Sequence, residues 1–318
     1  MADGSYRSEA RSLTNTQTPH GIPGANFLDP LVLARIDNLE LLARTVVEGF
    51  LNGLHRSPYL GLSVDFAEHR AYMPGDDIRR IDWRLWARTD RFYVKEFEAD
   101  TNANFSLILD VSRSMDYGSR GVTKLDYGRY LAACLAYFSR QQRDRVGLVT
   151  FDSDIVDRVP PSAKHLNIVL HTIDRLRPGG KGSLRAPLLR ISESLQRRSI
   201  LALISDLYEE PRVVLEAVNL LRAKGNDLIV FHLLDPAELE FSFEGAANFK
   251  DLEGDERIPV IPDQLRAQYR ELEAGHVREI GRLLGESRID YAFFDISQPL
   301  DYALFHYLSN RERTSRVR

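Results

Sequence analysis

Short apolar runs alternate with amphipathic segments along the chain from residue 103 onward. The apolar runs predict strands at 105–109, 146–151, 155–159, 200–205, 228–234 and 289–294. Apolar residues three or four positions apart predict helices at 124–142, 163–176, 184–197, 211–224, 264–284 and 302–308. Strands that alternate with helices predict an α/β fold, with a Rossmann-like, mostly parallel sheet and helices on both faces. The strands 146–151 and 155–159 are so close in sequence that we expect an antiparallel hairpin.

The pattern is different before residue 103. Residues 1–26 are polar and rich in Gly, Ser and Thr, which predicts a disordered tail. Asp29-Pro30 is typical of a helix start, and apolar residues recur from Leu33 to Leu54, so we expect one amphipathic helix within 27–54. Residues 55–102 contain a predicted turn at 72–77 and a predicted strand at 92–97, and we expect a smaller N-terminal β-rich module there.

The remaining segments complete the expected domain organisation. Residues 103–310 form one predicted domain, in which the irregular, Phe-rich segment 235–261 is expected to be a small hairpin insertion. Residues 311–318 form a basic tail. The length of 318 residues agrees with a two-domain organisation.

Composition excludes several classes of protein. The net charge of −4 gives no overall indication of binding to nucleic acid or to an anionic membrane. Cys134 is the only cysteine, so neither an intrachain disulfide nor a cysteine zinc site is possible; it is expected to be buried. No apolar run approaches the length of roughly 18 residues that spans a membrane, and the N-terminus lacks the apolar core of a signal peptide. We therefore expect no membrane span and a cytoplasmic location.

Residues 79–91 combine basic and aromatic side chains. Both tryptophans of the chain lie here, together with five arginines: Arg79, Arg80, Arg84, Arg88 and Arg91. One interpretation is a surface that binds nucleic acid by charge and stacking. The other is an ion-pair network around a short helix packed by Ile81, Trp83 and Leu85. Aspartates nearly balance the arginines, which favours the ion-pair network, since surfaces that bind phosphates are net basic.

Oxygen-bearing side chains follow the first strand of the predicted sheet. Asp110 ends the run 105–109, and Ser112 and Ser114 follow at alternate positions. In an open α/β sheet, ligands bind outside the carboxyl ends of the strands. Carboxylate and hydroxyl oxygens suit a hard cation such as Mg²⁺ or Mn²⁺. The alternative is that Asp110 and Ser112 only cap the next helix.

Two more segments are expected to reach the same edge of the sheet. Asp206 ends the strand 200–205, and Ser183 follows the glycine-rich loop 178–182. Because three of the five predicted ligands are hydroxyls, a cation bound by Asp110, Ser112, Ser114, Ser183 and Asp206 keeps residual positive charge. It would therefore attract an acidic residue of a partner protein. No His or Lys in these loops is an evident general base, so we expect a binding site and no enzymatic activity.

The predicted ligands resemble the metal-ion-dependent adhesion site (MIDAS) of von Willebrand factor A domains. The wider chain resembles the domain-of-unknown-function 58 (DUF58) family over about residues 55–310. The stretches that carry this second resemblance are Asp65-Phe66, Arg70-x-Tyr72-x-Pro74-Gly75-Asp76-Asp77-Ile78-Arg79-Arg80-Ile81-Asp82-Trp83, Ala87-Arg88-Thr89 and Leu234-Asp235-Pro236-x-Glu238. Ser183 stands where the adhesion site usually has threonine, and cationic residues lie nearby in sequence, so the cation is expected to bind weakly to the isolated protein.

The DUF58 resemblance also implies a partner. Members of the family often accompany MoxR-type AAA+ ATPases in bacteria, which implies that this protein is a partner or adaptor of such an ATPase, or binds its client protein, in chaperone-like assembly. Two alternatives remain open. Asp110 could be the nucleophile of a phosphatase or phosphotransferase, although Ser112 stands where such enzymes place a second aspartate. The other is binding of nucleic acid through residues 79–91.

Overall fold

The structure is a computed structural model that describes residues 29–36, 38–56, 68–71, 83–89, 91–96, 103–243, 245, 247–250, 257–300 and 303–304. The chain divides into two compact units. One contains Glu48–Glu98, and the other contains Phe27–Val47 and Ala99–Arg318. The larger unit carries the candidate site.

A six-stranded sheet forms the centre of the larger unit, in the order β10-β7-β6-β3-β4-β5. All neighbours are parallel except β4 and β5, which form the predicted antiparallel hairpin. Counted within this sheet, the order is the 3-2-1-4-5-6 arrangement of Rossmann folds, in which the strand order reverses between the first and fourth strands. The strands are β3 (Asn104–Asp110), β4 (Arg145–Phe151), β5 (Ile155–Ser162), β6 (Ile200–Ser205), β7 (Asp227–Leu234) and β10 (Asp290–Asp295).

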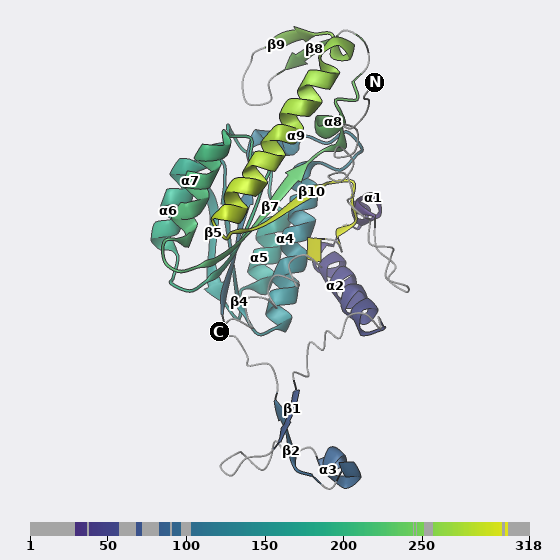
Figure 1. Ribbon diagram of the computed structural model, residues 1–318, viewed down its shortest axis with the longest axis vertical. Coiled ribbons are helices and arrows are strands. Elements are labelled where there is room, and N and C mark those ends of the chain that lie inside the picture. Colours follow the sequence, from purple (N-terminus) through teal and green to yellow (C-terminus); the bar gives the residue numbers. More distant parts are fainter. Residues whose placement is uncertain are drawn as a thin grey trace, which may run out of the picture. The chain divides into compact units, whose positions relative to one another are not determined.

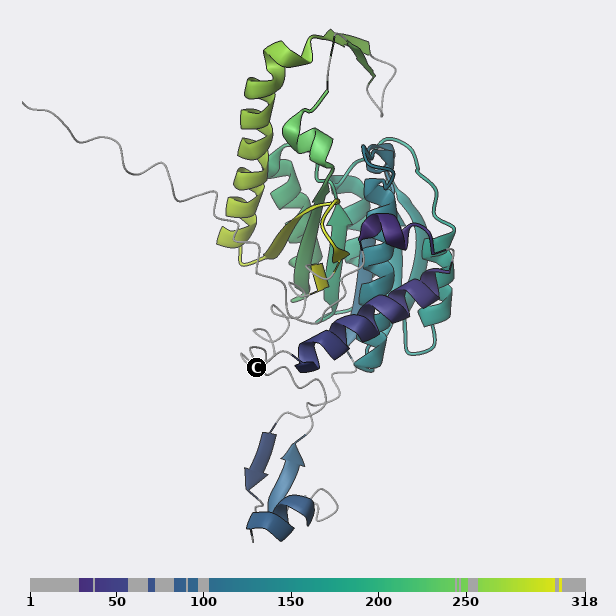
Figure 2. The same ribbon diagram turned by 90° about the vertical axis from the view of Figure 1, so that its right-hand side faces the viewer.

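Helices cover both faces of this sheet, which confirms the predicted α/β fold (Figures 1 and 2). One face packs against α4 and α5, and the other packs against α6, α7 and α9. Apolar side chains on both faces of the central strand explain why it must be covered twice: six of the seven residues of β3 are buried. The helices are α4 (Lys124–Gln141), α5 (Leu166–Asp174), α6 (Arg185–Ser194), α7 (Pro211–Arg222) and α9 (Pro262–Glu286).

The expected single helix within 27–54 is two helices, α1 (Pro30–Leu33) and α2 (Leu39–Arg56). Asp29 caps α1, because its carboxylate accepts a hydrogen bond from the N–H of Leu31 at 2.8 Å. Asn38 begins α2 in the same way: its side-chain oxygen accepts from the N–H of Leu41 at 2.9 Å. The apolar spacing continues across this break, so periodicity alone could not reveal it.

The segment after β7 forms an arm at the carboxyl edge of the sheet (Figure 1). It contains α8 (Pro236–Glu240), the antiparallel hairpin β8 (Ala247–Lys250) and β9 (Arg257–Val260), and the beginning of α9. Phe241 stacks on Tyr269 of α9 at a ring-centroid distance of 4.4 Å and on Phe249 of β8 at 5.6 Å. These aromatic contacts form a small apolar core for the arm. The hairpin predicted within 235–261 is therefore present.

The described part of the smaller unit contains the end of α2, two strands and the helix α3. β1 (Glu68–Ala71) pairs antiparallel with β2 (Tyr93–Glu96), and α3 (Trp83–Thr89) lies between them in sequence. Trp86 stacks on Phe92 at a centroid distance of 5.9 Å. Arg79, Arg80 and the predicted turn at 72–77 lie outside the described residues, as do the tails 1–26 and 311–318 and most of the predicted helix 302–308.

Candidate functional site

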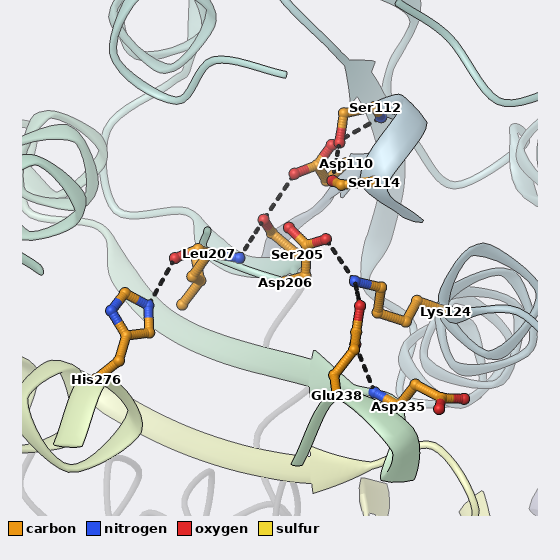
Figure 3. Close-up of polar contacts among 10 residues, drawn as sticks. All are labelled: Asp110, Ser112, Ser114, Lys124, Ser205, Asp206, Leu207, Asp235, Glu238 and His276. Atoms are coloured by element: carbon orange, nitrogen blue, oxygen red, sulfur yellow. Dashed lines mark hydrogen bonds and ion pairs between the residues drawn. The ribbon is translucent and has the colours of Figure 1, made fainter. Parts of the chain in front are cut away.

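The fold places Asp110 at the point where the strand order of the sheet reverses. Asp110 ends β3, which lies between β4 and β6, and only 4% of its surface is exposed. Its carboxylate accepts two hydrogen bonds, from the N–H of Ser112 at 2.9 Å and from the hydroxyl of Ser205 at 2.7 Å (Figure 3). In Rossmann-like sheets, the crevice at this reversal is the usual place for a ligand.

Ser112 and Ser114 follow Asp110 closely in sequence, and their side chains contact each other. Their hydroxyl oxygens are 3.0 Å apart (Figure 3). Ser112 precedes the short 3-10 helix η2 (Arg113–Asp116), but its side chain makes no capping hydrogen bond to that helix. The capping interpretation is therefore wrong for Ser112, and its hydroxyl is directed to Ser114 instead.

Asp206 follows β6, beside β3, and is bound to a residue that sequence reasoning missed. The ammonium group of Lys124 lies 2.8 Å from Asp206 Oδ2 and 2.8 Å from Glu238 Oε1. Lys124 is fully buried, and Asp206 is 2% exposed. Lys124 is the first residue of α4, whose preceding residue Thr123 forms a capping box with the helix. The structure thus places an internal cation on one predicted metal ligand.

Glu238 connects this ion pair to the arm. Asp235 and Glu238 form the capping box of α8: the N–H of Asp235 donates to Glu238 Oε2 at 2.8 Å, and Asp235 Oδ1 accepts from the N–H of Ala237 at 2.7 Å. The other oxygen of Glu238 binds Lys124. The stretch Leu234-Asp235-Pro236-x-Glu238, one of those that carry the DUF58 resemblance, therefore has a structural role at the site, and it was the sequence signal that could have revealed Glu238.

Burial and charge perturb the ionisation of this cluster. Burial, and then the negative charge of Asp206, raise the pKa of Asp110 to about 7. Burial also raises the pKa of Glu238, although Lys124 opposes the shift. Burial lowers the pKa of Lys124, but Asp206 and Glu238 outweigh it, so the net shift is upward and the ammonium stays charged. The carboxylates of Asp110, Asp206 and Glu238 outnumber the single ammonium group of Lys124, which leaves an excess of negative charge in a region of low dielectric.

The glycine-rich loop lies beside the Asp110 loop. Gly179 donates to the carbonyl of Val111 at 2.6 Å, and the N–H of Arg113 donates to the carbonyl of Gly180 at 2.9 Å. Asp152, at the end of β4, accepts from the N–H of Gly180 at 2.9 Å. A Cβ atom at Gly179 would lie 2.6 Å from Asp152 Oδ2 and 3.1 Å from the carbonyl oxygen of Val111, so a side chain here would displace the Asp152 carboxylate that binds Gly180. Asp152 is a second residue beside the site that sequence reasoning missed.

Ser183 is the predicted ligand that the structure connects least directly to the others. Its N–H donates to the carbonyl of Asp152 at 3.2 Å. Within the described chain, its hydroxyl makes no hydrogen bond to Asp110, Ser112, Ser114 or Asp206. Asp110, Ser112 and Ser114 thus share one hydrogen-bonded group, Asp206 belongs to the neighbouring ion pair with Lys124, and the backbone of Ser183 is bound to Asp152.

Comparison with known proteins identifies the family. The sequence pattern of the family described as "Protein of unknown function DUF58" matches residues 68–279, more than half of the chain. The chain belongs to the DUF58 family. Its relatives include the uncharacterized proteins Rv1480 of Mycobacterium tuberculosis (strain ATCC 25618 / H37Rv) and Mb1516 of Mycobacterium bovis. Each is 28% identical over 267 residues, which cover 80% of this chain and 82% of the relative.

Two solved structures also resemble this DUF58 protein. One is an aerotolerance-related membrane protein from Bacteroides fragilis, at 17% identity and a TM-score of 0.43, covering 63% of this chain and 96% of the other. The other is BatB from Bacteroides thetaiotaomicron, at 14% identity and a TM-score of 0.42, covering 66% and 99%. In this DUF58 protein, the helices among the described residues are all too short or too polar to cross a membrane.

Proposed function

We propose that this DUF58 protein is a non-enzymatic interaction module that binds an acidic side chain of a partner protein through Mg²⁺ or Mn²⁺. Asp110, Ser112, Ser114 and Asp206 would hold the cation, with Ser183 contributing from the glycine-rich loop. The cation would supply positive charge with an open coordination position for the partner's carboxylate. The resemblance to DUF58 proteins makes a MoxR-type AAA+ ATPase, or its client protein, the proposed partner.

The distance between the two serine hydroxyls is the observation that carries this proposal. Octahedral Mg²⁺ binds oxygen ligands at 2.0–2.1 Å, so adjacent ligands lie about 2.9 Å from each other. Ser112 Oγ and Ser114 Oγ are 3.0 Å apart. Among the described residues, no three His, Cys, Asp or Glu side chains are grouped closely enough to hold a metal ion. The proposed donor set would instead be rich in hydroxyls, and its two carboxylates, Asp110 and Asp206, would supply the negative charge.

The same geometry disfavours the phosphatase alternative. A nucleophilic carboxylate must be ionised and must reach the substrate, whereas Asp110 is 4% exposed and both of its oxygens accept hydrogen bonds. Its pKa, raised to about 7 by burial and by Asp206, further reduces its nucleophilic form at neutral pH. Binding of nucleic acid through residues 79–91 stays a second hypothesis, because Arg79 and Arg80 lie outside the described residues.

Calorimetric titration with Mg²⁺ and Mn²⁺ tests the proposed site directly. We expect binding by the wild-type protein and at least about tenfold weaker binding by Ser112→Ala and by Ser114→Ala, because each loses a hydroxyl ligand. Ser153→Ala is the matched control: Ser153 lies in an exposed loop at the same sheet edge, outside the site. Capture of the ATPase or its client should then require the cation and fail in EDTA. Equal cation binding by wild type and both site variants would refute the proposal.

A further inference from the structure

A shallow cleft lies between the loop after β6 and the middle of α9. Its volume is about 350 Å³, and it is lined by Tyr208, Glu209, Glu210, Leu272, Glu273 and His276. We refer to it as the acidic cleft. Three of its six lining residues are carboxylic acids, and none is Lys or Arg. The chemistry of the acidic cleft therefore favours a positively charged ligand.

Glu273 is the buried carboxylate among the lining residues of the acidic cleft. Its side chain is only 9% exposed, yet within the described structure its Oε1 atom has no hydrogen-bond partner. A buried carboxylate oxygen without a partner is unfavourable, and such groups in proteins are normally satisfied. Lys124 offers Glu273 only a charge interaction, because its ammonium group is bound to Asp206 and Glu238.

The other walls of the acidic cleft match a long, planar cation. Tyr208 is 42% exposed, and aromatic rings attract cations over their faces. The ring lies over Lys124, at 4.6 Å from Nζ to the ring centroid, so its position is fixed from within the protein. Leu272, which is 65% exposed, offers an apolar contact for a methylene chain. His276 is held in place by a 3.2 Å hydrogen bond between Nε2 and the carbonyl of Leu207.

A metal ion does not fit this arrangement. Within the described residues, no group of three Asp, Glu, His or Cys side chains could hold a metal ion, and the lining of the acidic cleft has no serine hydroxyl pair like that of Ser112 and Ser114. A volume of about 350 Å³ instead leaves room for a whole side chain. A guanidinium group combines a permanent charge, a planar fork of donors for carboxylates and the ability to stack on an aromatic ring.

We propose that the acidic cleft binds an arginine side chain of a partner protein. Glu273 and Glu210 accept hydrogen bonds from the guanidinium group, Tyr208 contacts its plane, and Leu272 contacts its methylene chain. This site is separate from the proposed cation site, although Tyr208 follows the predicted metal ligand Asp206 by two residues. A partner that uses both sites presents an acidic and a basic side chain to neighbouring positions at the same edge of the sheet.

The test uses the Leu272 methyl groups of the full-length protein as a reporter inside the cleft. The protein, ¹³C-labelled at leucine methyl groups, is titrated in EDTA with Nα-acetyl-arginine-N-methylamide. The probe with citrulline in place of arginine is the control, since citrulline has almost the same shape but no charge. We expect the arginine probe to shift the Leu272 signals in a saturable manner and the citrulline probe to leave them unchanged. Leu272→Ile identifies the signals.

Two variants connect the effect to the carboxylates. Glu273→Gln should weaken binding of the arginine probe by about tenfold, and Glu210→Gln, on the surface, should weaken it severalfold without any risk to folding. Glu271→Gln is the matched control: Glu271 is exposed on the same helix outside the cleft and should bind like wild type. Equal affinity for the two probes, or wild-type affinity in both cleft variants, would overturn the proposal. EDTA makes these outcomes independent of the cation site.

Discussion

Replacing Lys124 with methionine removes the only buried cation of the site while keeping most of the side-chain volume. Asp206 and Glu238 then lose the ammonium group that lies 2.8 Å from each of them. Breaking a buried ion pair in this way costs about 3–5 kcal/mol, because the remaining charge is left uncompensated. We therefore expect Lys124→Met to lower the free energy of unfolding by about this amount at pH 8 in EDTA. Urea unfolding followed by circular dichroism measures it.

The pH dependence of this loss distinguishes charge from packing. Burial raises the pKa of Glu238 although Lys124 opposes the shift, so we expect this pKa to rise further in the folded Lys124→Met variant. Protonation then favours the fold, so the stability difference between Lys124→Met and wild type should shrink as the pH falls from 8 to 5. Glu238→Gln in the Lys124→Met background should recover part of the loss, because one uncompensated charge is removed. Lys164→Met, at an exposed lysine, is the control and should change stability by less than about 0.5 kcal/mol.

Two results would refute this reasoning. A loss that is the same at pH 5 and pH 8 would mean that Lys124 stabilises the fold through its aliphatic chain. A loss no larger than that of Lys164→Met would mean that the buried ion pair contributes nothing. The proposed cation site adds an independent expectation: Mg²⁺ should raise the stability of Lys124→Met more than that of wild type, because the cation would compensate the charge that Lys124 no longer neutralises.

Three further predictions concern other residues of the site and its surroundings. Asp110→Asn should stabilise the protein at pH 8 in EDTA by up to about 4 kcal/mol, because the folded-state pKa of about 7 disfavours the ionised form of Asp110. The urea midpoints of variant and wild type should converge toward pH 4, and a stability difference independent of pH would contradict this cause. Burial lowers the pKa of His232 to about 3, so the contribution of neutral His232 to stability is complete above pH 6.5 and is lost as the pH falls toward 3. His232→Asn should remove this part of the acid dependence of the melting temperature, and an unchanged pH profile would exclude His232 as its source. Gly179→Ala should destabilise the protein by about 1–3 kcal/mol in thermal unfolding, because the alanine side chain would meet Asp152. Gly275→Ala, in open space within α9, is the control and should be neutral or stabilising; equal effects of the two variants would show that the close approach of Gly179 is unimportant.

The sequence by itself determined the elements of the larger unit and the local part of the site. The apolar runs and helical periodicities locate β3, β4, β6, β7 and β10 and the helices between them, because each element is specified by residues that are close in the chain. Asp110, Ser112 and Ser114 come together for the same reason: they are two residues apart, and the end of the buried strand directs them to the sheet edge. The break between α1 and α2 depends on the cap at Asn38, which the uninterrupted apolar spacing conceals.

Only the tertiary structure decided which distant residues complete the site. Lys124 is 82 residues from Asp206 and 114 residues from Glu238, and their contact depends on the order in which β3, β6 and β7 pair. No local pattern encodes that order, since the strands are all short apolar runs. From the sequence alone, Lys124 at the start of a helix would be predicted to be an ordinary surface lysine. It is buried because α4 packs across the sheet and places its ammonium group between the carboxylates of Asp206 and Glu238. Glu273 joins the acidic cleft for a similar reason, since α9 returns from the arm and passes beside the loop that follows β6.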